Sequence, residues 1–317
     1  MLFKIMSLII SRMIPDSKIF WSPVDPRTEG WPFVGNLPSL VILLAGYLYV
    51  VKVAGPRWMK DRVPFENLKP LMRVYNILMV FANAFMLQYI LRRTYLGGGY
   101  SLYCQGINYV DRSPQTMELL NALYYYTFVR IIDFLDTIFF VLRKKFSHVS
   151  FLHLSHHCLV VFIGWYGALH GYEGQPMLGT CINMFIHIIM YSYYFLASFG
   201  HRFKRYLVWK KYLTQLQLIQ FVIAIGHLIV PVFEKRCNVP LDHVVVVIGP
   251  TIFFLAMFCR FYVQTYVKRQ IKLTFKKRSI LEGELMKELQ FMPPAKNGNI
   301  RIVSFSDGRG YASKKGD

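Results

Sequence analysis

Residues 177–200 read MLGTCINMFIHIIMYSYYFLASFG, a block that contains no Lys, Arg, Asp or Glu. A helix rises about 1.5 Å per residue, so about 20 apolar residues are enough to cross the hydrocarbon layer of a bilayer. The block therefore predicts a membrane-spanning helix. Working outward from it, the same length criterion predicts seven spans in all, at residues 37–54, 74–91, 119–142, 151–170, 177–200, 206–232 and 243–267.

The composition supports this interpretation. The chain has 317 residues, of which 54% are hydrophobic, and a soluble domain of this size needs more polar residues to cover its surface. No internal repeat and no Ser/Gly-rich linker separates the apolar blocks. We therefore predict an all-α fold, a single integral membrane bundle of seven transmembrane helices.

The basic residues indicate how the bundle is oriented. The net charge is +20, and the Lys and Arg residues flank apolar blocks instead of forming one face of a soluble fold, which argues against a nucleic-acid partner. Cytosolic loops carry an excess of Lys and Arg. The segments after the first, third, fifth and seventh spans are the most basic, so we place them in the cytosol and the amino terminus in the lumen. Those segments are Arg57–Lys69, Arg143–Lys145, Arg202–Lys211 and Lys268–Arg278.

The last residues, Lys314-Lys315-Gly316-Asp317, resemble a dilysine signal that retrieves a membrane protein to the endoplasmic reticulum. We therefore predict a multi-pass protein of that membrane. Its positive charge suggests anionic lipid headgroups as partners. The predicted parts are a luminal segment, 1–36, a seven-span domain, 37–270, and a cytosolic basic tail, 271–317. From Ser279 onward we expect no fixed structure beyond a short helical patch.

The five cysteines show no metal-binding spacing. Cys158, Cys181 and Cys259 lie inside apolar blocks. Cys104 and Cys237 fall in two loops that the predicted topology places in the lumen, which is an oxidising compartment. We expect these two residues to form a disulfide that closes the luminal end of the bundle.

Three histidines form the strongest local feature of the sequence. His153, His156 and His157 are spaced i, i+3 and i+4, so that their imidazoles project from one face of a helix. They lie at the start of the fourth predicted span, near its cytosolic end. Ionisable groups at membrane depth are costly and normally face an interior cavity. A single histidine would be read as a satisfied core residue, whereas three together indicate a functional site.

Polar residues recur on three neighbouring spans. In the third span they include both charge signs, which is also what a buried salt-bridge network between helices would show. In the fifth and sixth spans the alternative is hydrogen bonding between helices. Because each of these spans is polar on one side, we favour a single cavity that the polar sides line. The residues are Arg130, Asp133 and Asp136, then Asn183, His187, Tyr191 and Tyr194, then Thr214, Gln217 and Gln220.

These motifs resemble those of the ELO family, the elongases of very long chain fatty acids. The family's HxxHH box is similar to residues 153–157, its HxxMYxYY signature to residues 187–194, and its TxxQxxQ element to residues 214–220. Gly55-Pro56, Met59, Arg62, Pro64 and Tyr75-Asn76 resemble the family's first cytosolic loop. The resemblance covers roughly residues 35 to 270.

One motif departs from the family pattern. The family's KxxExxDT appears here as residues 130–137, RIIDFLDT, with Arg130 in place of Lys and Asp133 in place of Glu. The charge is kept at each position. Arginine, however, is a planar donor that does not readily give up its proton, and aspartate is one methylene shorter. The roles of these two residues therefore cannot be carried over directly.

The resemblance implies a 3-ketoacyl-CoA synthase with a central acyl tunnel and with neither a cofactor nor a metal ion. Its substrates would be a long-chain acyl-CoA and malonyl-CoA, and its products a 3-ketoacyl-CoA, CO2 and CoA. We expect His156 to carry the acyl group as an acyl-imidazole, because neutral imidazole is a nucleophile. His153 and His157 would tune or orient it, and His187 would polarise the thioester or assist decarboxylation. Cys158 is the weaker alternative nucleophile, since it projects about 100° away from His157.

The remaining polar residues are assigned to binding. Asn183, Gln217 and Gln220 would hydrogen-bond developing oxyanions, and basic residues such as Lys144 and Lys211 would hold the CoA phosphates. Homo-oligomers and contacts with the other enzymes of the elongation cycle are expectations from the family alone.

Two other classes of protein share part of this pattern. A membrane desaturase or hydroxylase with two iron ions needs about eight histidines in several clusters, whereas the other histidines here are scattered singly. A seven-span receptor or a transporter is compatible with the number of spans, but a transporter usually has broken helices and paired repeats. Neither of these two classes calls for three histidines on one face.

Overall fold

The computed structural model describes residues 22–97, 99–200, 203, 209–234, 237–291, 303–306 and 309–312. The basic residues between 204 and 208, Lys235, Arg236 and the dilysine ending lie outside the described residues. The chain divides into two units, Met1–Tyr262 and Val263–Asp317, each of which is described by itself.

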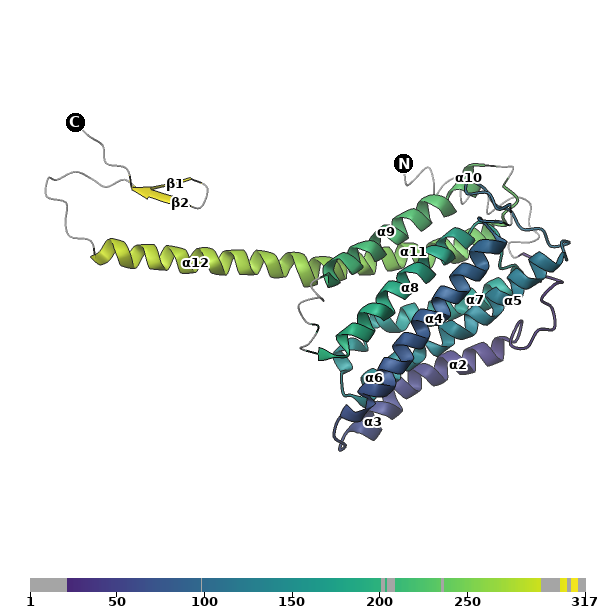
Figure 1. Cartoon of the computed structure of the whole chain (residues 1–317), viewed down its shortest axis with the longest axis horizontal. Coiled ribbons are helices and arrows are strands. Elements are labelled where there is room, and N and C mark those ends of the chain that lie inside the picture. Colours follow the sequence, from purple (N-terminus) through teal and green to yellow (C-terminus); the bar gives the residue numbers. More distant parts are fainter. Residues whose placement is uncertain are drawn as a thin grey trace. The chain divides into compact units, whose positions relative to one another are not determined.

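The first unit is built from long helices that run from one end of it to the other (Figure 1). In chain order these are α2 (Leu37–Tyr49) with η1 (Val50–Ala54) and α3 (Gly55–Met59), α4 (Lys69–Arg93), α5 (Pro114–Ile132) with α6 (Phe134–Leu142), α7 (Phe151–His170), α8 (Met177–Ala197), α9 (Lys210–Leu228) with α10 (Val230–Phe233), and α11 (Leu241–Tyr262). The short 3-10 helices η2 (Glu66–Leu68) and η3 (Phe146–His148) lie in the connections.

Local sequence explains where several of these helices begin. The side chains of Asn36, Ser113 and Ser150 each accept a hydrogen bond from the backbone N–H three residues on, and so cap α2, α5 and α7. Proline occupies one of the first helical positions of α2 and α5, where its missing N–H costs nothing. The cap at Ser150 fixes the first turn of α7, which contains His153.

Six helices of the first unit form a closed ring. The contacts run from α4 to α8, α9, α11, α7 and α5 and then back to α4, while α2 packs against α7. Close packing within the ring depends on small residues: a Cβ atom at Gly164 of α7 would lie 2.8 Å from the hydroxyl oxygen of Thr127 on α5. The ring therefore has tight walls around an interior.

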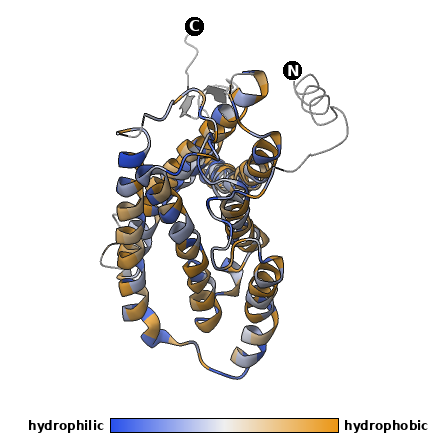
Figure 2. Ribbon diagram, turned by 90° about the vertical axis from the view of Figure 1, so that its right-hand side faces the viewer, coloured by the Kyte–Doolittle hydropathy of each residue, from blue (hydrophilic) through white to orange (hydrophobic). Residues whose placement is uncertain are grey.

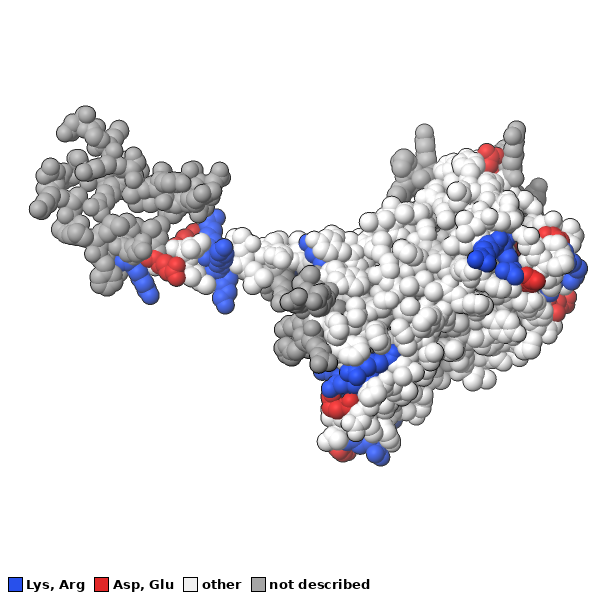
Figure 3. Space-filling view, in the orientation of Figure 1, with Lys and Arg blue, Asp and Glu red and all other residues white. Residues whose placement is uncertain are grey.

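The outer surface of this unit is apolar. Large side chains such as Ile42, Phe81 and Val222 are more than half exposed, and apolar residues run along the helices between more polar ends (Figure 2). In the face shown by Figure 3, charged side chains gather at the ends of the unit and leave an uncharged belt between them. Such a surface suits lipid, because only there does exposing large apolar side chains cost nothing.

Among the residues that the structure describes, six helices are long and apolar enough to cross a membrane: Leu37–Met59, Glu66–Arg93, Phe151–His170, Met177–Ala197, Lys210–Phe233 and Leu241–Val267. These findings confirm the all-helical integral membrane fold. The predicted count of seven is not confirmed, because the third expected span forms two shorter helices, α5 and α6, which are separated at Asp133.

The segment 22–36 folds over one end of the ring, which we call the disulfide end because Cys104 and Cys237 lie there. Arg27 is fully buried and contacts Asp25 at 2.7 Å and Glu173 at 2.5 Å, and it donates to the backbone oxygen of Asn108. Burial acts to lower the pKa of Arg27, but the two carboxylates raise it overall. Burial raises the pKa of Glu173, against the opposing effect of Arg27.

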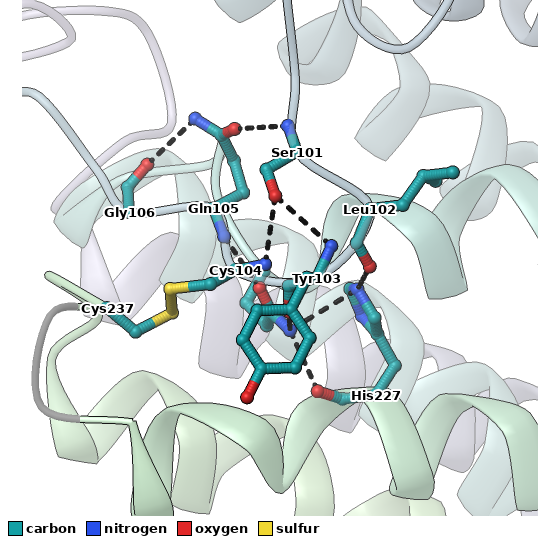
Figure 4. Close-up of a disulfide and its surroundings, with 9 residues drawn as sticks. Ser101, Leu102, Tyr103, Cys104, Gln105, Gly106, His227 and Cys237 are labelled. Carbon is teal, nitrogen blue, oxygen red and sulfur yellow. Dashed lines mark hydrogen bonds between the residues drawn. A yellow bond between two sulfur atoms is a disulfide. The ribbon is translucent and has the colours of Figure 1, made fainter.

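The two loop cysteines at this end are bonded, with their Cα atoms 5.5 Å apart and 133 residues between them in sequence. The bond joins the α4–α5 connection to the α10–α11 connection (Figure 4). Nearby, the Nε2 atom of His227 donates to the backbone oxygen of Leu102, and the amide of Gln175 donates to the backbone oxygen of His227. The disulfide thus reinforces a junction that is already hydrogen-bonded.

We expect three free thiols in unreduced protein, because Cys158, Cys181 and Cys259 are unpaired, and five after reduction. Counting alkylated cysteines by mass spectrometry of denatured protein, with and without reductant, measures both numbers. The matched variant Cys104→Ser should show four free thiols without reductant. Five free thiols in unreduced wild-type protein would contradict the pairing.

The second unit contains η5 (Val263–Val267), α12 (Lys268–Phe291) and the antiparallel strands β1 (Val303–Ser306) and β2 (Arg309–Ala312), in which Ser304 pairs with Tyr311. On its surface, Arg278 and Glu282 form an exposed ion pair one helical turn apart. Residues Ser279–Phe291 belong to α12, in line with the short helical patch expected there, whereas β1 and β2 lie in the part of the tail for which we expected no fixed structure.

Candidate active site

A cavity of about 170 Å³ lies inside the helix ring. Its walls come from α5, α7, α8, α9 and α11 together with the connection between α7 and α8. Most lining residues are apolar, including Val160, Ile163, Phe221, Leu228, Val247 and Phe254. The polar ones include Arg130, His156, Asn183, Gln220 and His243.

The three histidines of α7 lie together, as their spacing predicts. The ring centroids of His153 and His157 are 4.3 Å apart, and those of His156 and His157 are 5.8 Å apart. Of the three, only His156 lines the cavity. It also faces α8, where the ring of His187 lies 6.3 Å away and within 20° of parallel. The imidazoles of two helices therefore converge beside the cavity.

His153 is held by hydroxyl groups. Its Nε2 atom lies 2.8 Å from Oγ1 of Thr137, which in turn lies 2.7 Å from the hydroxyl oxygen of Tyr47. The ring of Tyr47 stacks on that of Phe134, 4.0 Å away. Two neighbouring helices, α2 and α6, thus fix the first imidazole of the cluster, and with it the packing of His157.

The tautomer of His187 follows from its partner. Its Nδ1 atom lies 2.8 Å from the backbone oxygen of Asn183, and a carbonyl oxygen can only accept. Nδ1 therefore carries the hydrogen, and in the neutral ring Nε2 has the free lone pair. This arrangement leaves Nε2 able to accept a proton or a hydrogen bond.

The polar residues of the third predicted span form a buried network that involves four helices, α4, α5, α6 and α8. NH1 of Arg130 lies 3.0 Å from Oδ2 of Asp133, and NH2 donates to the side-chain oxygen of Asn83 on α4 at 2.7 Å. The hydroxyl of Tyr191 on α8 lies 2.8 Å from both Asp133 and Asp136. The sequence left a salt bridge and a place at the cavity as alternatives for Arg130, and the structure shows both, since the paired arginine also lines the cavity.

Some of the other predicted binding residues line the cavity and others do not. Asn183 and Gln220 line the cavity, whereas Gln217, Thr214 and Tyr194 do not. The hydroxyl of Thr214 bonds within its own helix, and Tyr194 is 38% exposed. Lys144 donates to the backbone oxygen of Lys60, and Lys211 lies 6.0 Å from the ring of Tyr262. The structure does not bring these two lysines to the cavity wall.

Sequence reasoning missed four residues that shape the site. They are Asn83, which binds Arg130, Tyr126, whose ring lies 4.6 Å from the guanidinium carbon of Arg130, Tyr47 and His243. A buried asparagine inside an apolar block was the available signal for Asn83. His243 is also buried, and its Nε2 atom has no hydrogen-bond partner within the described part of the chain.

Within the described residues, no group of three or more His, Cys, Asp or Glu side chains is arranged to hold a metal ion. The imidazoles contact one another and hydroxyl groups instead. The polar side chains that line the cavity carry imidazole, guanidinium, amide and hydroxyl groups.

The fold and the site define a class: an all-helical, multi-span membrane protein whose polar groups meet at a cavity inside the bundle. Residues 32–274, which include the whole site, match the GNS1/SUR4 family, also called ELO. This chain belongs to that family.

Three related proteins align with most of this chain. The human protein named very long chain fatty acid elongase 4 is 38% identical over 263 residues, which cover 81% of this chain and 82% of the relative. The Drosophila melanogaster protein named very long chain fatty acid elongase 7 is 37% identical, with 78% and 74% covered. The Mus musculus protein named very long chain fatty acid elongase 2 is 36% identical, with 83% and 88% covered.

Proposed function

We propose that this protein is an enzyme of fatty acid elongation that condenses a long-chain acyl-CoA with malonyl-CoA to give a 3-ketoacyl-CoA, CO2 and CoA. The observation that carries the proposal is the position of His156, a potential nucleophile at the wall of a mostly apolar cavity inside a membrane bundle. The names of the relatives support the same class of reaction.

The length of the cavity supports a long acyl chain. Along α7 the lining runs from His156 to Gly167, and Gly171 follows just beyond the helix. The helical part covers 167 − 156 = 11 residues, or about 16 Å at about 1.5 Å per residue. One leaflet of a bilayer, which is as thick as a lipid acyl chain is long, measures about 15 Å. A chain attached at His156 and directed toward the disulfide end would therefore be enclosed over a comparable length.

The first step would be acyl transfer to His156. The lone pair of the neutral imidazole attacks the thioester carbonyl, the C–S bond breaks, and the CoA thiolate leaves and takes a proton from water at the cytosolic side. The other ring nitrogen keeps its hydrogen, so the acyl group resides on a cationic imidazole. In the second step, malonyl-CoA loses CO2 and its C2 carbon attacks the acyl carbonyl. The C–N bond then breaks and neutral imidazole is regenerated.

Fixed neutral donors are suited to this chemistry. The amides of Asn183 and Gln220 face the cavity, where an oxyanion developing on the acyl carbonyl would need hydrogen bonds in a site with little water. His187 offers Nε2 as an acceptor from the neighbouring helix. His153 and His157 would orient His156 through the contacts described above.

The basic residues at one end of the unit indicate where CoA would bind. CoA would bind at the end of the unit opposite the disulfide, where Lys144, Lys211 and Arg143 supply positive charge without an acidic partner in the contacts described. We place this end in the cytosol, by the loop charges, and propose the endoplasmic reticulum as the membrane. Association with a second copy, and with the enzymes that reduce and dehydrate the product, remains part of the same proposal.

The test is an assay of purified protein with labelled malonyl-CoA and a panel of acyl-CoA lengths. We expect label in a 3-ketoacyl product two carbons longer than the acyl substrate, with equal amounts of CO2 released. Label that enters no acyl product with any chain length, in protein that is folded, would refute the proposed reaction.

A bulky side chain in the cavity should limit chain length. Ile163 lines the cavity about 10 Å along α7 from His156, by the rise of the helix. We expect Ile163→Trp to abolish elongation of the longest accepted acyl-CoA while shorter ones are still elongated. The control is Val222→Trp, which adds the same indole at an exposed position outside the lining. An unchanged product profile in Ile163→Trp would place the acyl chain elsewhere.

A further inference from the structure

The guanidinium of Arg130 is the only cationic side chain of fixed charge among the described residues that line the cavity, and that lining contains no Asp or Glu. The side chain of Arg130 is 3% exposed. A charge this deeply buried is costly unless it is paired and hydrogen-bonded. The degree to which its partners satisfy it therefore indicates whether the group is purely structural.

Arg130 is only partly satisfied. NH2 bonds to Asn83, and NH1 lies 3.0 Å from Asp133, yet neither NH1 nor Nε has a hydrogen-bond partner within the described part of the chain. Asp133, the counter-ion, also contacts the hydroxyl of Tyr191. A buried donor without a partner costs about 1–3 kcal/mol and more when it is charged. Such a group at a cavity wall is typical of a site that awaits an anionic atom.

The surroundings fix the direction of the unsatisfied donors. The guanidinium carbon lies 4.6 Å from the ring centroid of Tyr126, and Asn83 holds NH2, so that the plane of the group is constrained from two sides. Arg130 shares the cavity wall with His156, the proposed acyl carrier. An oxygen atom bound by Arg130 at this wall would thus lie in the same cavity as the acyl group on His156.

We propose that Arg130 binds the thioester oxygen of malonyl-CoA and stabilises the enolate formed when CO2 leaves. The inference rests on the proposed function and adds a division of labour within it. His156 carries the acyl half of the reaction, and Arg130 serves the malonyl half.

Arg130 accelerates the reaction only if it binds the oxygen of malonyl-CoA that gains negative charge in the transition state. A cation on the carboxylate would stabilise the ground state and oppose the loss of CO2, whereas a cation on the thioester oxygen gains strength as negative charge moves there. The C–C bond to the carboxylate breaks, and its electron pair forms the C1–C2 double bond and displaces the carbonyl pair onto oxygen. This enolate then attacks the acyl carbonyl through C2, and the C–N bond to imidazole breaks. No proton is exchanged in this step.

Arg130→Gln separates the two halves. With acyl-CoA alone, we expect the variant to release about one equivalent of CoA and to form the acyl adduct as wild-type protein does. With malonyl-CoA added, CO2 release and product formation should fall by about 10²–10³-fold, the usual effect of losing one donor to a developing oxyanion. The control is Arg92→Gln, an exposed arginine at the end of α4, which should match wild-type protein in both assays.

Arg130→Lys tests the same role with the charge kept. A single ammonium cannot offer the two-point fork of a guanidinium, so we expect acyl transfer as in wild-type protein and a smaller loss of CO2 release, about 10-fold. The intact acyl-transfer step also reports that each variant is folded around the cavity.

The outcomes separate the two proposals. Normal CO2 release in Arg130→Gln, or an equal loss in both half-reactions, would overturn the role of Arg130 and leave the covalent step at His156 intact. Failure of wild-type protein to release CoA from acyl-CoA alone would refute the covalent step, and the CO2 assay of the complete reaction would still decide the role of Arg130.

Discussion

Replacing His156 with alanine is expected to abolish elongation, with a loss of at least about 10³-fold in turnover, as is usual when a covalent nucleophile is removed. The imidazole lies at the cavity wall, and its ring is 6.3 Å from that of His187. No other described residue has both a free nucleophilic atom at the wall and a neighbouring imidazole at this distance. Product formation from acyl-CoA and malonyl-CoA by the purified variant measures the loss.

The fold should survive this substitution. Within the described residues, no hydrogen bond reaches the ring nitrogens of His156, so truncation leaves no buried partner unsatisfied. The control is Ser155→Ala on the same helix, whose hydroxyl bonds back to the backbone oxygens of Phe151 and Leu152; it should keep near-normal activity. Elution as a monodisperse species and an unchanged melting temperature would establish folding, and retained turnover in His156→Ala would contradict the nucleophile role.

Arg27→Ala is expected to have the largest effect on stability. The change leaves the buried carboxylates of Asp25 and Glu173 without their cation, and breaking a buried ion pair by removing one partner costs about 3–5 kcal/mol. A large fall in melting temperature of detergent-solubilised protein would measure it. Arg278→Ala, which removes an exposed pair, should leave the stability almost unchanged because surface pairs contribute about 0–1 kcal/mol.

The loss of stability in Arg27→Ala should depend on pH. Burial raises the pKa of Glu173 even with Arg27 present, and without Arg27 the burial effect and the charge of Asp25 are opposed only by a backbone hydrogen bond. A carboxyl whose pKa is raised in the folded state binds its proton more tightly there than in the unfolded chain, so the folded state gains stability as pH falls. The difference between Arg27→Ala and wild-type protein should therefore shrink from neutral to acidic pH. A difference that is small at neutral pH, or that grows on acidification, would contradict this account of the network.

Helix positions and the identity of the central imidazoles could be predicted from the sequence because both depend on local spacing. The block 177–200 exceeds the length of a span, and the i, i+3, i+4 spacing of His153, His156 and His157 puts them on one face in any helix. The break at Asp133 could not be read in the same way, since an aspartate between two apolar segments is compatible with a continuous helix.

Long-range contacts escaped prediction for a physical reason. The pairing of α4 with α8 and of α5 with α7 depends on how side chains interlock, and hydropathy carries no information on it. Asn83 therefore could not be matched with Arg130, nor Arg27 with Glu173. Lys144 and Lys211 were assigned by charge alone, and charge fixes only the end of the bundle at which they lie.

The central claim is that His156 carries the acyl group. Incubating the protein with a long-chain acyl-CoA, without malonyl-CoA, and analysing its peptides by mass spectrometry tests this claim directly. We predict an acyl group on His156 that disappears when malonyl-CoA is added, while the longer product forms. An acyl group on Cys158, or turnover without any acyl adduct on the protein, would contradict it.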